Sequence, residues 1–259
     1  MELKYKGTPI FYREEGKGTA LILLHGFLEH SGIWDDLTAA FSDRYRVIRI
    51  DLPGHGNSGC NGYIHTMEFM AESVKAVLDH LRIRRAVLAG HSMGGYVALA
   101  LSEKYPELPK ALILINSTPL ADSEEKKKNR DRAIAAVKHN HKNFIRVSVS
   151  NLFRPKNRKI FREEINTLKE EALKTPLQGI VAALEGMKIR LDREVIMYFT
   201  PYPKMVILGA KDPVVDANSL AERLKRSAAD IVVLPDGHMS FIENREALKE
   251  NIGNFLKKI

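Results

Sequence analysis

The feature that most constrains the fold is a regular alternation of short apolar runs with longer amphipathic stretches. Each run is apolar on both faces, as a parallel strand must be when helices cover both sides of its sheet. The runs span residues 21–24, 47–50, 86–89, 111–115, 205–208 and 231–234. Helix-length stretches separate them near residues 31–42, 66–81, 93–104, 216–227 and 240–257. This order predicts a doubly wound α/β body.

Two further strand-like runs precede this alternation. Residues 3–6 and 10–13 flank Gly7-Thr8-Pro9, which predicts an opening hairpin. Together with the six apolar runs, they predict a mostly parallel sheet of eight strands.

The alternation stops over residues 119–200, where the sequence carries helix signals only. A long helical run can begin at Asp122 or Ser123, a second run spans 158–174, and a third opens at Thr175-Pro176. Strands then resume as though nothing had been inserted.

We therefore expect one core domain, made of residues 1–118 and 201–259, with a helical cap at 119–200. The cap is expected over the carboxyl ends of the strands, because open α/β sheets bind their ligands there.

Positive charge is concentrated in the same segment. The chain carries a net charge of +8, and residues 119–200 hold 18 Lys and Arg against 11 Asp and Glu, a net charge of +7. A solvated helical face explains such an excess, and so does attraction of an anionic substrate or an acidic surface. No nucleic-acid-binding motif accompanies the charge, so we expect no nucleic-acid partner.

Several other classes of protein are disfavoured by composition. The single cysteine, Cys60, excludes an internal disulfide and a thiolate metal site, and no phosphate-binding glycine loop is present, so we expect no metal or cofactor. No apolar stretch reaches the length of about 18 residues that could cross a bilayer. Residues 1–6 lack the apolar run of a signal peptide, and we expect a cytoplasmic protein without a membrane partner. Oligomeric state is not predictable from these features.

The sharpest motif is Leu88-Ala89-Gly90-His91-Ser92-Met93-Gly94-Gly95, which places Gly-x-Ser-x-Gly between a strand and a helix. A serine at such a turn is held in a strained conformation, and the flanking glycines prevent clashes. Its hydroxyl is then exposed at a helix N-terminus, where a developing negative charge is favoured. We expect Ser92 to be a nucleophile.

A serine nucleophile needs a general base and a carboxylate that orients the base. His238 lies in a loop directly after the strand 231–234, and Asp212 follows the strand 205–208. Both are therefore expected at the same edge of the sheet as Ser92, in the chain order Ser, Asp, His of α/β hydrolases.

Other residues compete for these roles. Asp216 and Asp236 are rivals of Asp212, with Asp216 better placed as a helix cap, whereas Asn116 stands at the alternative acid position and carries no charge. The side chain of His91 is expected to point away from Ser92. Four more histidines fall in helical stretches and are expected at the surface: His65, His80, His139 and His141.

With these motifs, the chain resembles the α/β-hydrolase superfamily along nearly its whole length. It is similar to the small, capped bacterial branch that includes carboxylesterases, the pimeloyl-ester hydrolase of biotin synthesis and the lyase of menaquinone synthesis. Leu24-His25-Gly26-Phe27 resembles the oxyanion loop of the family, and the segment 51–58 resembles its turn after the following strand.

The resemblance implies roles for several residues. The backbone N–H groups of Phe27 and Met93 would form the oxyanion hole, His25 would brace its loop, and Asp51 and His55 would be structural. It also excludes two neighbours. Haloalkane dehalogenases and epoxide hydrolases carry an aspartate at the position of Ser92, and proline iminopeptidases have a longer glycine-rich oxyanion loop.

The expected activity is hydrolysis of a carboxylic ester, or a related acyl bond, of a small molecule through an acyl-enzyme. An apolar acyl pocket can be lined by Leu28, Tyr96, Phe144 and Phe153 as substrate-binding residues, together with Phe27, Trp34 and Met93. Residues of these types at helical spacing also serve as ordinary core.

Two alternative functions stay open. If an arginine of the cap turns inward, the substrate would carry a carboxylate or phosphate, which favours a lyase of the menaquinone-pathway type over general ester hydrolysis. The candidates are Arg146, Arg154 and Arg190. The second alternative is a ligand receptor of this fold without catalysis.

Overall fold

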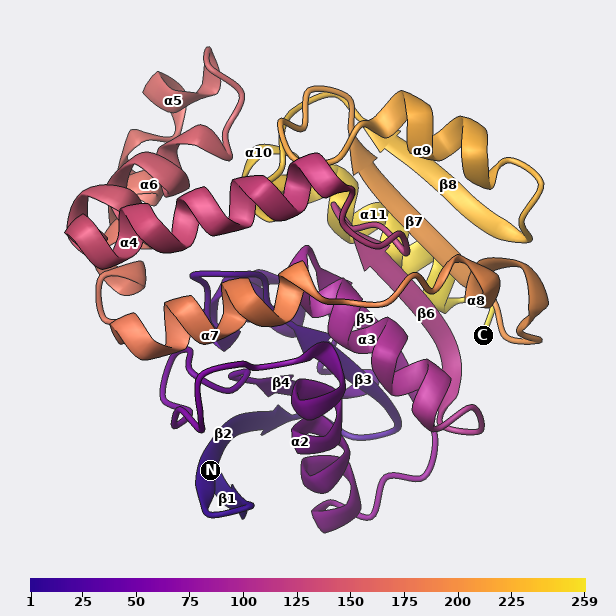
Figure 1. The fold of residues 1–259 in the computed structure, drawn as a ribbon. Helices are drawn as coiled ribbons and strands as arrows, with labels where there is room; N and C mark the ends of the chain where they lie inside the picture. Colours follow the sequence, from indigo (N-terminus) through magenta and orange to yellow (C-terminus); the bar gives the residue numbers. More distant parts are fainter.

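A single eight-stranded sheet runs through the molecule and is covered by helices on both faces (Figure 1). The computed structural model describes all residues, 1–259. In chain order the strands are β1 (Glu2–Tyr5), β2 (Thr8–Glu15), β3 (Thr19–Leu24), β4 (Tyr45–Ile50), β5 (Ala86–His91), β6 (Pro109–Ile115), β7 (Lys204–Gly209) and β8 (Ala229–Leu234). Their spatial order is β1-β2-β4-β3-β5-β6-β7-β8, and only the pairs β1·β2 and β2·β4 are antiparallel. The predicted mostly parallel, eight-stranded sheet is confirmed.

The strands differ in burial as their places in the sheet require. Every residue of the central strand β5 and of β7 is buried, because helices cover both faces there. The edge strand β8 is only partly covered, and Val233 is exposed. The strands β3, β5, β6 and β7 are neighbours and run parallel. Their carboxyl ends therefore form a continuous rim at the middle of the sheet.

The helices of the core fall into two layers. One layer contains α2 (Met67–His80), α3 (Met93–Lys104) and α9 (Ala217–Leu224), and it packs on the sheet in an apolar cluster of 46 buried residues. The other layer contains a 3-10 turn η1 (Ser31–Trp34), α1 (Asp35–Phe41), α10 (Ser240–Glu243) and α11 (Arg245–Leu256), with 22 buried residues. The helix expected at 240–257 is interrupted at Asn244, whose φ of −136° is not helical.

The segment between β6 and β7 contains helices and no strand. These are α4 (Glu124–Asn151), α5 (Asn157–Ile160), α6 (Arg162–Ala172), α7 (Leu177–Lys188) and α8 (Glu194–Phe199). Ser123 caps α4 by accepting a hydrogen bond from the Lys126 N–H, and α4 is kinked at Asn140. In Figure 1, α4 and α7 lie side by side near the arrowhead of β6. That residues 119–200 act as a cap stays a prediction.

Helix α7 approaches the core closely through two glycines. A Cβ on Gly186 would overlap the carbonyl oxygen of His65, and a Cβ on Gly179 would overlap the carbonyl of Gly54. The His65 N–H also donates to the Ala182 carbonyl at 2.9 Å. His65 is therefore fully buried in the loop before α2, and its expected place on a helix surface is wrong.

None of the helices combines the length and the apolar character that crossing a membrane requires.

Candidate active site

Ser92 occupies the sharp turn between β5 and α3. Its backbone has φ 48° and ψ −114°, in the left-handed region that an L-residue adopts only under strain. The turn is tight, because a Cβ on Gly90 would overlap the backbone of Gly94, and a Cβ on Gly94 would overlap the carbonyl of Leu24. The Ser92 side chain is thereby lifted to the rim of the sheet, at the N-terminus of α3.

His238 joins Ser92 to Asp212. The Nε2 atom of His238 lies 2.9 Å from the Ser92 Oγ, and its Nδ1 atom lies 2.8 Å from the Asp212 Oδ2. Because a carboxylate only accepts, the Nδ1–H donates to Asp212 and leaves Nε2 free to accept the hydroxyl proton of Ser92. The structure brings the three residues together as the sequence predicts.

Asp212 is held as an anion by its surroundings. Its side chain is fully buried, and burial alone would raise its pKa. The His238 ring, together with the backbone N–H groups of Val214 and Val215 at 2.8 and 3.1 Å, lowers the pKa below its ordinary value.

The two rival carboxylates have other partners. Asp216 caps α9 by accepting from the Ser219 N–H at 3.0 Å, as its position in the sequence indicates. Asp236 forms an ion pair with Arg154 at 3.0 Å. Neither contacts His238.

Asn116, which the sequence analysis set aside as uncharged, is a site residue whose role the sequence reasoning missed. Its Nδ2 donates to the Asp212 Oδ2 at 3.1 Å and to the Gly237 carbonyl at 3.2 Å, so it links the carboxylate to the loop of His238. It sits after β6 with φ 46°, a conformation that Asn tolerates better than most residues. The available signal was its position at the carboxyl end of a strand.

A second buried network lies behind the triad. His91 is fully buried, and its Nδ1 lies 3.0 Å from the Glu29 Oε2 while its Nε2 donates to the His238 carbonyl at 2.9 Å. The same Glu29 oxygen accepts the Gly26 N–H at 2.6 Å. As predicted, His91 does not contact the Ser92 hydroxyl, but Glu29 is a second residue that the sequence reasoning missed.

In the pair formed by His91 and Glu29, each charge stabilises the other. Burial alone would lower the pKa of His91, but the Glu29 carboxylate raises it above its ordinary value. Burial alone would raise the pKa of Glu29, but His91 lowers it. The result is a buried ion pair that joins the loop of Gly26 to the loop of His238.

The loop after β3 contains Phe27, one of the two expected oxyanion donors, and its conformation is fixed by His25. The His25 Nε2 accepts the Leu52 N–H at 2.8 Å, which leaves the Nδ1–H to donate to the Gly26 carbonyl at 2.7 Å. His25 thus braces the loop. Met93 is the first residue of α3, and N–H groups of a first helical turn have no acceptor within the helix. That the N–H groups of Phe27 and Met93 form an oxyanion hole stays a prediction.

Asp51 and His55 have structural contacts, as the resemblance implies. Asp51 accepts backbone N–H groups from Ser31 at 2.7 Å and Asn57 at 2.8 Å. Burial lowers the pKa of His55 to about 3, and its ring packs against His25 and Phe27.

A cavity of about 370 Å³ lies between this rim and helix α4. It is lined by four of the residues proposed for an acyl pocket, namely Phe27, Leu28, Tyr96 and Phe144. Phe153, Trp34 and Met93 do not line it. Phe153 and Trp34 are instead buried in the cluster on the opposite side of the sheet, and Met93 is buried in the core beneath α3. The sequence cannot distinguish a buried aromatic from one that faces a cavity.

The three arginines considered from the sequence are not free cations in this cavity. Arg190 is buried, pairs with Asp122 at 2.7 Å and stacks on the Tyr96 ring at 4.1 Å. Arg154 is paired with Asp236, and Arg146 is exposed to solvent. Cations that do line the cavity come from other positions of α4, Lys126 and Arg130.

The segment after α4 is hydrogen-bonded to the loop of His238. The His238 N–H donates to the Leu152 carbonyl at 3.1 Å. Two groups donate to the Glu243 Oε1, the Arg154 N–H at 3.1 Å and the Asn157 side chain at 2.9 Å. The histidine loop and the end of α4 therefore form one connected unit.

No group of three or more His, Cys, Asp or Glu side chains is arranged to hold a metal ion. Cys60 is a free thiol with its Sγ 3.6 Å from the His65 ring. The expectation that no cofactor is needed stays a prediction.

The chain is similar in sequence to two proteins described below and in structure to a third. A dihydrolipoyllysine-residue acetyltransferase component of the acetoin cleaving system from Pseudomonas putida is 30% identical over 93% of this chain, which spans 64% of that protein. A pimeloyl-[acyl-carrier protein] methyl ester esterase from Aeromonas hydrophila is 26% identical over 93% of this chain and 96% of that protein. A thermophilic esterase from Thermogutta terrifontis, solved with malate bound, is 30% identical with a TM-score of 0.91, covering 99% of this chain and 96% of its own.

The alpha/beta hydrolase fold family matches residues 19–245, a range that includes Ser92, Asp212 and His238. The match covers most of the chain, and the spatial order of the strands agrees with it. The chain therefore belongs to the α/β-hydrolase fold family.

Proposed function

We propose that this protein is a serine esterase that hydrolyses carboxylic esters of small molecules. The observation that carries the proposal is the hydrogen-bonded chain Ser92–His238–Asp212 beside a cavity of about 370 Å³. Residues 119–200 act as its cap, because α4 supplies one wall of that cavity. The relatives named as esterases support the same reaction class.

The reaction would proceed in two acyl transfers. The Ser92 Oγ attacks the ester carbonyl carbon while its proton passes to the His238 Nε2. The negative charge that develops on the carbonyl oxygen is stabilised by the N–H groups of Phe27 and Met93. Protonated His238 then donates to the leaving alkoxide, and the alcohol departs from an acyl-enzyme on Ser92. In the second transfer, water attacks the acyl carbon while its proton passes to the His238 Nε2. His238 then returns this proton to the Ser92 Oγ as the acid departs.

Asp212 contributes without taking a proton. It fixes His238 in the tautomer with hydrogen on Nδ1 and stabilises the imidazolium that forms as Ser92 attacks. The depressed pKa of Asp212 keeps the carboxylate charged for both purposes. Asn116 helps to hold this carboxylate by donating to the same Oδ2 atom that accepts from His238.

The proposal is tested by replacing the nucleophile. Ser92→Ala should lower kcat for a short-chain 4-nitrophenyl ester by at least about 10⁴-fold, because Ser92 carries the hydroxyl that is hydrogen-bonded to the His238 ring. The same variant should no longer react with a fluorophosphonate probe. Ser219→Ala, an exposed serine on α9, is the matched control and should keep both activities. Retention of ester hydrolysis or of labelling by Ser92→Ala would contradict the proposal.

A further inference from the structure

The cavity next to the oxyanion loop has two chemically different walls. Its apolar wall includes Phe27, Leu28, Phe144 and Leu184, which suit a hydrocarbon chain. Its polar wall is contributed by the first half of α4 and includes Lys126, Asn129 and Arg130, together with Asp122 just before the helix.

The charges of the polar wall do not balance. Asp122 is the only carboxylate that lines the cavity, and it is shared between Arg130 at 3.0 Å and Arg190 at 2.7 Å. One anion therefore faces two guanidinium groups. Lys126 adds a third positive charge, and its Nζ contacts only the Val214 carbonyl, at 3.5 Å.

Arg130 retains hydrogen-bonding capacity. Its Nε donates to Asp122, while neither Nη group donates to any acceptor in the protein. A guanidinium whose two Nη groups are free presents a planar pair of donors that matches a carboxylate. The Lys126 ammonium, four residues earlier and one turn away, supplies a further donor on the same wall.

We propose that Lys126 and Arg130 bind a carboxylate of the substrate, so that this enzyme prefers half-esters of dicarboxylic acids to neutral esters. The inference rests on the proposed esterase function and specifies its substrate class. The apolar wall holds the methylene chain, and the cationic wall holds the distal carboxylate. Arg190 is excluded from this role, because it is buried between Asp122 and the Tyr96 ring and does not line the cavity.

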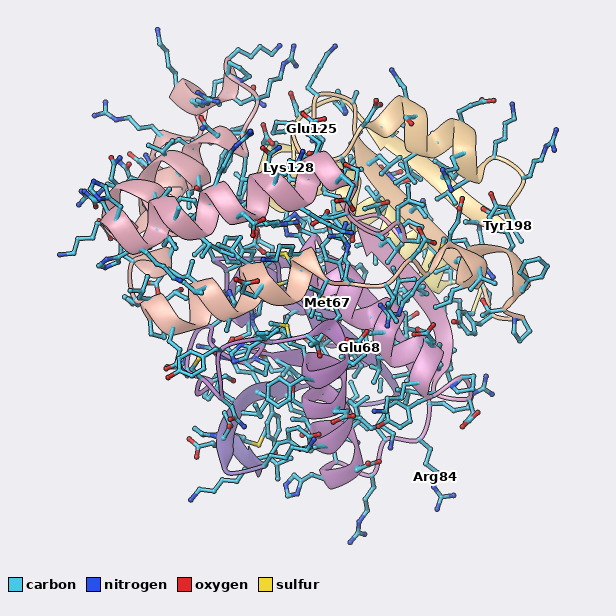
Figure 2. The ribbon with its side chains drawn as sticks, viewed as in Figure 1. Met67, Glu68, Arg84, Glu125, Lys128 and Tyr198 are labelled. Atoms are coloured by element: carbon cyan, nitrogen blue, oxygen red, sulfur yellow. The ribbon has the colours of Figure 1, made fainter.

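The test compares two esters of equal chain length, monoethyl glutarate and ethyl pentanoate, with the double variant Lys126→Met/Arg130→Gln. Lys128→Met/Arg132→Gln is the matched control, because it removes the same charge from exposed positions of α4 that do not line the cavity; Lys128 is labelled in Figure 2. Assays in about 0.3 M salt screen long-range electrostatic effects and leave direct contacts in place.

We expect the wild-type protein to have the higher kcat/KM for monoethyl glutarate. The ratio of kcat/KM values for the charged and neutral esters should fall by about tenfold or more in Lys126→Met/Arg130→Gln, since charge-assisted hydrogen bonds are lost. The control variant should keep the wild-type ratio. An unchanged ratio in the first variant, or an equal fall in both variants, would overturn the inference while leaving ester hydrolysis established.

A binding measurement separates this inference from the proposed reaction. Glutarate should raise the Tm of Ser92→Ala, and the rise should disappear when Lys126→Met/Arg130→Gln is added but not when the control substitutions are added. If glutarate does not raise the Tm of Ser92→Ala, with or without the control substitutions, the carboxylate site is absent. If glutarate binds but the wild-type protein hydrolyses no ester, the proposed function fails and the anion site stands.

Discussion

His91 and Glu29 connect two loops that approach the nucleophile from different parts of the chain. The Glu29 carboxylate accepts the Gly26 N–H in the loop after β3, and His91 donates to the carbonyl of His238. The pair is buried, so each charge depends on the other for its stabilisation. Loss of either charge therefore disturbs stability and the alignment of the site together.

The pair predicts how stability changes with pH. The folded-state pKa of His91 is raised, so its contribution is complete at low pH and is lost as pH rises through that raised pKa. The pKa of Glu29 is lowered, so its contribution is lost as pH falls through it. Urea unfolding should therefore show a free energy of unfolding that declines as pH rises through the raised pKa of His91.

Glu29→Gln provides the control for that pH profile. It should lower the free energy of unfolding at neutral pH by roughly 3 kcal/mol, because breaking a buried pair leaves its partner uncompensated. It should also remove the alkaline decline, since the pKa of His91 is no longer raised. A decline of equal size in Glu29→Gln and wild type would show that other groups cause it.

At this scale the sequence predicts the triad but not the groups that support it. Ser92, Asp212 and His238 each follow a strand, and a parallel sheet brings such positions to one edge. Asn116 also follows a strand, but a search for a charged third member passes over it. Glu29 lies in an irregular loop, and its contact with His91 exists only after the chain has folded.

Among the elements, α7 needs glycine at two positions, Gly179 and Gly186, where it approaches the core. Gly186→Ala should destabilise the protein by about 2 kcal/mol and raise KM, because the new Cβ overlaps the His65 carbonyl and displaces α7 from the core. Thermal unfolding and ester kinetics measure the two effects.

Gly253→Ala is the matched control within α11. Its Cβ would meet only the Phe41 ring at 3.4 Å, an ordinary contact, so Ala should be neutral or stabilise the helix by about 0.5–1 kcal/mol. Equal effects of the two substitutions would show that helix propensity, and not the approach of α7, decides the outcome.

The positions of the strands and core helices were predictable where the hydrophobic periodicity is strong. The interruptions of these helices were not predictable. The strands and the helices of the core follow from apolar patterning. The break at Asn244 and the 3-10 turn that ends at Trp34 lie on the same face of the sheet, where the Trp34 and Phe241 rings pack 6.2 Å apart. Such contacts join residues distant in sequence, so no local pattern announces them.

For the whole molecule, the distribution of charge matters more than its total. Residues 119–200 carry +7 of the net +8, and much of this charge lies on exposed faces of the cap helices. The segment charge is predictable from the sequence. The cations that face the cavity are not predictable, because Asp122 is shared by Arg130 and Arg190, whereas the Lys126 Nζ contacts only the Val214 carbonyl.

Concentrated positive charge predicts a salt effect on substrate capture. Raising ionic strength from about 0.01 M to about 0.5 M should lower kcat/KM for monoethyl glutarate several-fold, because screening shortens the range of the cap's field. Ethyl pentanoate should show little change. Stopped-flow or steady-state assays across a salt series measure both, and parallel slopes for the two esters would argue against electrostatic attraction.

The hydrogen bonds that join Leu152 to His238, and Arg154 and Asn157 to Glu243 of α10, have a mechanical consequence. That end of the helical segment is anchored to the general base, so lifting it would pull the imidazole out of register with Ser92. If α4 moves to admit substrate, movement at its other end, near Ser123, would leave these hydrogen bonds in place. We therefore expect the end at Leu152 to act as the pivot, so that Ser92, His238 and Asp212 stay hydrogen-bonded during substrate entry.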